Sequence, residues 1–401
     1  MEMNKTVCYL NSNDGTSILA FGEKARLKIT SEKALIALQQ FLLEHPNVYL
    51  FGYLAYDLKN ELYDLSSDNK DGLEFPTLFF WEPSCVVKIA NVNVEFLQGE
   101  NTASHLLFIN NFLEQQNNQT SSSFGFEFKA RTSKEAYLTN LVHLKNYIQR
   151  GDIYEVNYCQ EFYCENATIT APIQVYWKLN QLTKAPFSSY FHFDDFTLFC
   201  GSPERFIKKN ENRLLSQPIK GTAARNAILA LDEEAKVDLK NNPKERAENI
   251  MIVDLVRNDL SKIALPKSVL VDELCGVYSF ENVHQMISTI SCEMNSKISF
   301  TDIIRATFPM GSMTGAPKLK AMEIIEETED FKRGLYSGSI GYIAPNGDFD
   351  FNVVIRSLLY NEVNSYLSCS VGSAITIQSN PAAEYEECFT KIKRILDGLH
   401  A

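Results

Sequence analysis

The sequence predicts an α+β fold in which large antiparallel β-sheets pack together and are flanked by helices. Strand-like stretches follow one another in groups, and helices are clustered between those groups. Short alternations of one strand with one helix are few, which argues against a doubly wound parallel sheet. At 401 residues, the chain is long enough to bury a substantial core in one large domain or two smaller ones.

Composition excludes several classes of protein. A content of 45% hydrophobic and 22% charged residues is that of an ordinary globular chain. It rules out an intrinsically disordered chain and a collagen-like protein. The net charge of −12 disfavours nucleic acid and an anionic membrane surface as partners. An anionic substrate would therefore need cations placed locally around it.

Cysteine usage and hydropathy indicate the compartment. The nine cysteines are scattered without a C-x-x-C pair, in a chain too large to need disulfide staples, so we expect reduced thiols. Residues 1–14 are polar, and no run of about 18 apolar residues occurs. We therefore expect a cytoplasmic protein that does not span a membrane.

A polar stretch divides the chain. Residues 117–123 read NNQTSSS, which suits a linker or a long surface loop. We expect a variable N-terminal α/β portion at residues 1–118, a linker or loop at 119–132 and a catalytic region at 133–401. In the N-terminal portion, aromatic and β-branched runs at 47–55 and 76–81 predict strands, separated by an acidic, serine-rich turn region around 64–71.

The elements after the boundary are longer and more regular. Ser133 is a candidate N-cap for a helix that ends at Gly151, since apolar residues recur there at helical spacing. Further helices are predicted at 243–260, 317–329 and 381–399, each with proline near its first turn. Strands are predicted at 153–162, 196–200, 338–343, 349–360 and 366–377.

Two of these helices begin with a pair of carboxylates three residues apart. The pairs are Glu245 with Glu248, and Glu384 with Glu387. Acidic residues favour the first turn of any helix because of the helix dipole, which is the simpler explanation for one pair. If the two helix faces converge, the four carboxylates would repel one another unless a divalent cation lay among them. Oxygen ligands of this kind suit Mg²⁺.

Lys220 and Glu204 are each open to two interpretations. Lys220, in the segment QPIKGT, is either a solvated loop lysine or a buried nucleophile. Glu204, in the segment SPERF, either pairs with a cation on the surface or donates a proton from a cleft where its pKa is raised.

A glycine-rich loop and the histidines give weaker indications of a functional site. Residues 311–318 read GSMTGAPK, which does not fit the G-x-x-x-x-G-K-[ST] register of a nucleotide phosphate loop. What remains is a glycine-rich loop before a helix, whose free N–H groups could hold a carboxylate or a phosphate. The six histidines form no compact ligand pattern, and a structural role is expected for His284.

Several motifs together resemble the chorismate-utilising enzymes, which include anthranilate, aminodeoxychorismate, isochorismate and salicylate synthases. In the family's order they are GDIYEVN at 151–157, SPERF at 202–206, PIKGT at 218–222, RAEN at 246–249, GSMTGAPK at 311–318, RGLYSG at 333–338 and EYEE at 384–387. The resemblance covers residues 133–400, whereas residues 1–118 resemble only the variable N-terminal portion of the family. It implies the family's fold of packed antiparallel sheets.

The resemblance also assigns residues position by position. It implies a catalytic acid at Glu204 and Mg²⁺ held by Glu248 and Glu387, with Glu245 and Glu384 reaching its waters. Tyr336 and Arg356 would hold the enolpyruvyl carboxylate, and Ser312 with the backbone at Gly372–Ala374 would complete the pocket.

One position separates the branches of the family. The residue between Ile219 and Gly221 is usually alanine, but it is lysine in aminodeoxychorismate synthases, and here it is Lys220. The resemblance therefore implies amination of chorismate at C4 through a lysine adduct at C2, on the route to p-aminobenzoate and folate. Glu155 stands where isochorismate and salicylate synthases place a water-activating lysine, which disfavours hydroxylation.

The resemblance leaves two other functions open. One is anthranilate synthase component I, although Gln285 aligns with the histidine that those enzymes use for pyruvate elimination. The other is a non-catalytic regulatory paralogue. The sequence shows no G-x-C-x-G nucleophile elbow, so ammonia is expected from a separate glutamine amidotransferase subunit.

Overall fold

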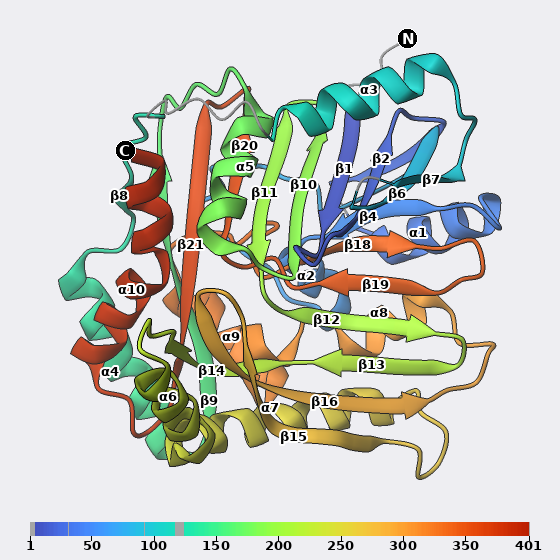
Figure 1. Cartoon of the computed structure of the whole chain (residues 1–401). Coiled ribbons are helices and arrows are strands. Elements are labelled where there is room, and N and C mark those ends of the chain that lie inside the picture. The colour runs from blue at the N-terminus through green and yellow to red at the C-terminus, as the bar shows by residue number, and fades with distance from the viewer. Residues whose placement is uncertain (1–4, 31, 92, 117–123, 401) are drawn as a thin grey trace.

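The computed structural model describes residues 5–30, 32–91, 93–116 and 124–400, and two large antiparallel sheets dominate it (Figure 1). Helices cover the outer faces of the sheets, and both sheets combine strands from the beginning and the end of the chain. The predicted α+β fold of packed antiparallel sheets flanked by helices is therefore confirmed.

The first sheet holds eleven strands among the described residues. Their order is β17 (Gly315–Ala316), β9 (Glu155–Cys164), β21 (Tyr366–Ile375), β20 (Ser357–Asn361), β11 (Phe196–Ser202), β10 (Phe187–Phe193), β1 (Thr6–Asn11), β2 (Thr16–Phe21), β6 (Cys85–Ala90) and β7 (Asn93–Gln98), with β8 (Lys129–Ala130) beside β9.

The second sheet holds ten strands in the same described ranges. Their order is β14 (Ile219–Ala224), β16 (Val283–Glu293), β13 (Arg213–Gln217), β12 (Arg205–Asn210), β19 (Phe349–Asn352), β18 (Ser339–Ile343), β4 (Leu50–Leu54), β5 (Leu78–Glu82) and β3 (Ala25–Ile29), with β15 (Leu270–Ser279) beside β16.

The helices lie on the outer faces of this pair of sheets (Figure 1). They are α1 (Ala34–Glu44), α2 (Lys59–Tyr63), α3 (Ala103–Glu114), α4 (Lys134–Arg150), α5 (Pro172–Thr183), α6 (Leu229–Asn241), α7 (Pro243–Ser261), α8 (Phe300–Thr307), α9 (Lys318–Thr328) and α10 (Pro381–His400), with short 3₁₀ turns η1 (Tyr56–Leu58) and η2 (Gly311–Met313). Helices α4, α5 and α10 pack on the first sheet, whereas α6 and α7 pack on the second.

The main core is an aromatic layer between the two sheets. Trp81 on β5 stacks on Phe191 of β10 with ring centroids 5.2 Å apart, and Phe79 lies 4.3 Å from Phe193. All four side chains are fully buried. Such ring pairs add to the stabilisation from buried apolar area, so the sheets are held in a fixed relation to each other.

Local signals in the sequence set the ends of the predicted helices. The Ser133 side chain accepts a hydrogen bond from the N–H of Ala136 at the start of α4, and Gly151 ends that helix with a φ of 83°. Helices α7, α9 and α10 confirm the other three helix predictions to within one or two residues. Predicted strands at 47–55, 76–81, 153–162, 196–200, 338–343 and 366–377 correspond to β4, β5, β9, β11, β18 and β21.

The single strand predicted at 349–360 is wrong, because the chain changes sheets inside it. Strand β19 belongs to the second sheet and β20 to the first. The connecting residues 353–356 cross between them, and Arg356 takes a φ of 51° that a continuous strand would not allow. Strands β11 and β12 make a similar crossing between the two sheets, with Glu204 in the connection.

The N-terminal portion contributes strands to both sheets, since β1 pairs with β10 and β4 pairs with β18. Of the predicted linker at 119–132, residues 119–123 lie outside the described residues, and β8 in the remainder pairs with β9. No helix in the described ranges is long and apolar enough to cross a membrane.

Candidate active site

The candidate site lies where the chain crosses between the two sheets. The N–H of Val353 donates to the carbonyl of Glu204 at 3.0 Å, and the N–H of Gly201 donates to the carbonyl of Arg356 at 3.1 Å. These bonds join the crossing after β11 to the crossing after β19. Two residues predicted for the site, Glu204 and Arg356, are thereby brought together although about 150 positions separate them in the chain.

Glu204 is buried, which excludes the surface ion pair left open above. Only 4% of the residue is exposed, and Ser312 Oγ donates to its Oε1 at 2.6 Å. Burial raises the pKa of Glu204 to about 7, although Ser312, Lys220 and Arg356 each act to lower it. A carboxyl group with this pKa is partly protonated near neutral pH and can donate a proton.

Lys220 on β14 does not extend into solvent. Its Nζ donates to Oε1 of Glu155 at 2.8 Å, and the two side chains are 11% and 1% exposed. Burial opposes the charged form, but Glu155, Glu248 and Glu204 outweigh it and raise the pKa of Lys220 above its usual value. The lysine is therefore held as an ammonium, and its charge in turn lowers the pKa of Glu204.

Gly221 lets β14 bring this lysine into the site. Its φ of 92° is a conformation that other residues rarely adopt, and a β-carbon there would lie 3.1 Å from Oε2 of Glu245 and 3.2 Å from Leu239. The pairing of β14 with β16 also shifts register between Ile219 and Thr222. The irregular part of β14 around Lys220 packs against α7.

The two acidic helix starts lie close together, which the sequence had left open. Lys244 Nζ on α7 lies 3.3 Å from Glu384 Oε1 on α10 and 3.8 Å from Glu248 Oε1. Glu384 and Glu248 are buried, and Ser373 Oγ donates to the other oxygen of Glu384. On the same side of α10, Lys391 donates to Glu387 at 2.8 Å and to the carbonyl of Gly372 at 3.0 Å.

This cluster fits a divalent cation in its donor chemistry. Glu248 Oε1 is buried without a hydrogen-bond partner in the described part of the chain, and burial raises the pKa of Glu248 to about 7. Burial also raises the pKa of Glu245. The described residues contain no group of three histidine, cysteine, aspartate or glutamate side chains that lie close enough together to form a metal site. Glu248, Glu387, Glu245 and Glu384 are the carboxylates that would hold a cation, and its charge would supplement the charge that Lys244 supplies here.

A pocket of about 440 Å³ opens beside the acidic cluster. It is lined by Lys244, Glu248 and Met251 of α7, by Tyr154 and by the segment 376–378 before α10, with Ile148, Gln149 and Ala247 completing the wall. Its size suits a small organic substrate.

The remaining predicted binding residues lie in the crossing after β19, in the turn before β18 and on β21. The Arg356 guanidinium makes no hydrogen bond to any residue that the structure describes, so it is available to an anion. Burial raises the pKa of Tyr336 well above its usual value, which keeps the hydroxyl protonated as a donor. Strand β21 pairs Gly372 with Cys159 and Ala374 with Asn157, so the predicted backbone contacts lie beside β9.

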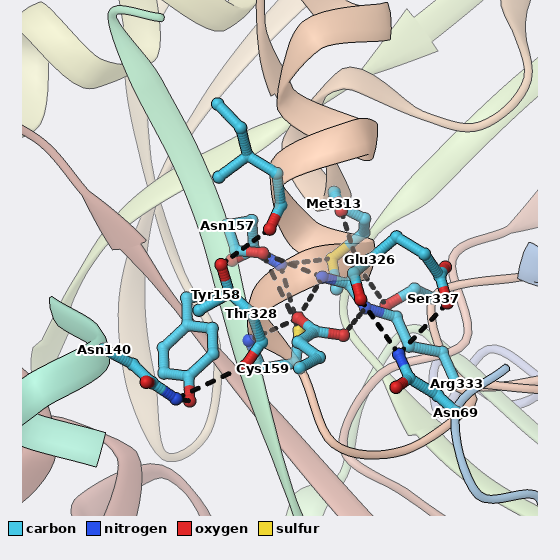
Figure 2. A network of polar contacts seen from close by, with 12 residues as sticks. Asn69, Asn140, Asn157, Tyr158, Cys159, Met313, Glu326, Thr328, Arg333 and Ser337 are labelled. Atoms are coloured by element: carbon cyan, nitrogen blue, oxygen red, sulfur yellow. Dashed lines mark hydrogen bonds and ion pairs between the residues drawn. The ribbon is translucent and has the colours of Figure 1, made fainter. Parts of the chain in front are cut away.

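Arg333, to which sequence reasoning gave no role, lies in a buried network of polar contacts (Figure 2). Its guanidinium donates to both oxygens of Glu329, at 2.8 and 2.6 Å, and to the carbonyls of Met313 and Asn157. Glu329 in turn accepts from the N–H of Cys159. The buried ion pair between Arg333 and Glu329 thus links β9, η2 and the loop before Tyr336 by hydrogen bonds. The only signal in the sequence was the place of Arg333 in the RGLYSG motif.

Other residues that stood out in the sequence have structural roles. His284 is satisfied by Asp232 at 3.0 Å and by Ser279 at 2.8 Å, as expected. Lys318 donates to Asp259 and to the carbonyls of Thr307 and Pro309, so it holds its own loop together. The amide group of Gln285 is buried and has no partner among the described residues.

Comparison with known proteins identifies the family of the chain. Residues 5–397 match the family described as chorismate binding enzyme. The chain is 36% identical over 355 residues to "Aminodeoxychorismate synthase component 1" of Klebsiella aerogenes, covering 87% of this chain and 77% of that protein. It is 39% identical over 274 residues to the protein of the same name in Escherichia coli, covering 68% of this chain and 59% of that protein.

Solved structures show the same fold. Anthranilate synthase component I from Streptococcus pneumoniae superimposes with a TM-score of 0.79 at 23% identity, covering 95% of this chain and 92% of that one. A putative 2,3-dihydroxybenzoate-specific isochorismate synthase from Bacillus anthracis gives a TM-score of 0.75 at 20% identity, covering 98% and 96%.

Proposed function

This chain belongs to the chorismate binding enzyme family, and we propose that it is component I of an aminodeoxychorismate synthase. It would convert chorismate and ammonia to 4-amino-4-deoxychorismate, a precursor of p-aminobenzoate and folate. The observation that carries this proposal is the buried Lys220 amine at 2.8 Å from Glu155, close enough to Glu204 for the two groups to shift each other's pKa. Relatives that carry this name are 36% and 39% identical to the chain.

The acid in this reaction would be Glu204. The C4 hydroxyl of chorismate leaves poorly unless it is protonated, and a carboxyl group with a pKa of about 7 can supply that proton near neutral pH. Ser312 fixes the carboxyl group at 2.6 Å, which orients the donor before the substrate arrives.

The nucleophile would be Lys220. Its neutral amine attacks ring carbon C2, the two ring double bonds shift, and the C4–O bond breaks. Ammonia then adds to C4, the double bonds shift back, and the lysine leaves C2. The adduct divides one difficult allylic displacement into two easier steps.

The substrate carboxylates would be bound at two places. Arg356 and Tyr336 would hold the enolpyruvyl carboxylate, with backbone groups at Gly372 and Ala374 completing the pocket. Glu248 and Glu387 would hold Mg²⁺ directly and Glu245 and Glu384 through its waters, and the ion would neutralise the ring carboxylate. The buried Glu248 oxygen that lacks a partner among the described residues supports this ligand set.

Ammonia would come from a separate glutamine amidotransferase subunit. No G-x-C-x-G nucleophile motif occurs in residues 1–401, so these residues do not themselves carry a glutaminase nucleophile of that kind. The alternative of anthranilate synthase component I would release pyruvate from the same substrates. A non-catalytic paralogue is disfavoured, since an idle site has no physical reason to keep a buried ion pair beside a buried acid.

The test is product identification by mass spectrometry after incubation with chorismate, ammonium and Mg²⁺. The proposal expects 4-amino-4-deoxychorismate without pyruvate. Lys220→Ala should abolish product while circular dichroism stays native, and Lys208→Ala, at a half-exposed lysine on β12, is the matched control. Lys220→Gln keeps a donor to Glu155 should the alanine variant unfold. Full activity in both Lys220 variants, or pyruvate as product, would contradict the proposal.

A further inference from the structure

Glu155 places a carboxylate directly against the proposed nucleophile. It begins β9, and its Oε1 accepts the hydrogen bond from Lys220 Nζ at 2.8 Å. Only 1% of its side chain is exposed, so bulk water has little access to the pair. Its other oxygen, Oε2, is buried and has no hydrogen-bond partner within the described ranges. A buried base with unused acceptor capacity therefore contacts the amine.

Lys220 cannot attack as the ammonium ion that the site holds. A protonated amine has no lone pair, so one proton must leave before the bond to C2 forms. The carboxylates around the lysine oppose this loss: they are Glu155 on β9, Glu204 in the crossing after β11, Glu245 and Glu248 on α7, and Glu387 on α10. Some group in the site must take the proton when the substrate arrives.

We propose that Glu155 is the catalytic base that accepts this proton, a role that rests on the lysine adduct of the proposed function. Bound substrate would cover the 11% of the Lys220 side chain that is exposed and exclude the water that still reaches it. Excluding water penalises two charges more than a neutral amine beside a neutral acid. Substrate binding itself would therefore favour transfer of the proton along the existing hydrogen bond.

The proton is returned within one turnover. In the first step an N–H bond of Lys220 breaks, its proton goes to Glu155, and the freed electron pair forms the bond to C2. The C4 oxygen leaves with the proton of Glu204 as water. In the second step ammonia bonds to C4, and Lys220 leaves C2 with its electron pair and regains the proton from Glu155. The new C4 ammonium gives one proton back to Glu204. Nothing is oxidised or reduced.

A simpler role for Glu155 predicts the opposite experimental result. If Glu155 only held Lys220 charged and in place, Glu155→Gln would ease loss of the lysine proton and leave the rate at pH 7 unchanged or faster. If Glu155 is the base, the same variant should lower that rate at least tenfold, since general bases contribute about 10²–10⁴-fold. Glutamine keeps the size and an acceptor oxygen, so the lysine stays positioned.

The measurement is the single-turnover rate of 4-amino-4-deoxychorismate formation with Mg²⁺ and ammonium, from about pH 6 to about pH 9. For Glu155→Gln we expect the rate to rise with pH toward wild type, because solvent then deprotonates Lys220. Lys220→Ala should stay inactive at every pH. Formate should restore part of the activity of Glu155→Ala, whereas chloride at the same ionic strength should not.

The matched control is Glu161→Gln. Glu161 lies on the same strand, is also buried, and pairs with Arg131 away from Lys220. Its loss should lower stability but leave the pH profile unchanged. If Glu155→Gln matches or exceeds wild type at pH 7 while Lys220→Ala is inactive, only the role of Glu155 is overturned. An active Lys220→Ala would overturn the proposed function instead.

Discussion

The ammonium group of Lys244 on α7 lies 3.3 Å from the carboxylate of Glu384 on α10. The same nitrogen lies 3.8 Å from Glu248 Oε1, so one side chain links the two acidic helix starts. Lys244 thus neutralises part of the negative charge of Glu384 and Glu248, which Mg²⁺ would neutralise in the proposed enzyme. Cation and lysine cannot occupy the same space between these carboxylates, so they should compete.

We expect Lys244→Met to tighten Mg²⁺ binding and to weaken the protein treated with a chelator. Without the lysine, Glu384 and Glu248 repel each other, and because Lys244 is partly exposed the loss should be about 1 kcal/mol. Isothermal titration with Mg²⁺ and thermal unfolding in chelator would measure both effects. Lys240→Met, at an exposed lysine on α6, changes the net charge equally and should alter neither. An unchanged or weaker Mg²⁺ affinity in Lys244→Met would exclude competition.

Glu387→Gln should raise the Mg²⁺ concentration needed for half-maximal activity by about tenfold or more, since it removes a proposed anionic ligand. A magnesium titration of product formation is the measurement. The neighbouring Glu386→Gln is the control, because Glu386 is exposed and pairs with Lys134. An identical titration in the Glu387 and Glu386 variants would remove Glu387 from the ligand set.

Glu204→Gln should be inactive yet more stable than wild type at pH 8. Folding raises the pKa of this carboxyl group from 4.5 to about 7, so its contribution to stability is complete below pH 4.5 and is lost as the pH rises through 7. Glutamine does not titrate, so the variant avoids this loss, which is on the order of 3 kcal/mol in the free energy of unfolding. Urea unfolding at pH 5 and pH 8 would measure the difference, and an equal effect at both values would argue against a raised pKa.

Arg333→Met should destabilise the fold by about 3–5 kcal/mol, because Glu329 would be left buried without its charge partner. The double variant Arg333→Met/Glu329→Gln removes both charges and should recover part of that loss. Chemical denaturation of the single and double variants would show the coupling. Additive losses would mean that the ion pair between Arg333 and Glu329 contributes little beyond its separate hydrogen bonds.

Much of the local structure could be predicted from the sequence. The ends of several helices are set by residues that act only on neighbouring backbone groups. These residues are the serine and glycine at the two ends of α4 and the prolines at the first turns of α7 and α10, so the helix ends could be predicted without knowing the fold. The strand predicted at 349–360 failed for a non-local reason. Its apolar residues suit a strand throughout, but packing two sheets together required the chain to change sheets at residues 353–356.

The sequence alone determined which residue types could do chemistry: an amine at Lys220, an acid at Glu204 and two acidic helix starts. Only the tertiary structure decided that these groups are buried and meet. Three hydrogen bonds join residues that are far apart in the sequence: Lys220 with Glu155, 65 positions apart, Ser312 with Glu204, 108 apart, and Lys244 with Glu384, 140 apart. Short-range preferences specify helices and turns, whereas desolvation and charge pairing depend on which distant side chains the packed sheets bring within a few ångströms.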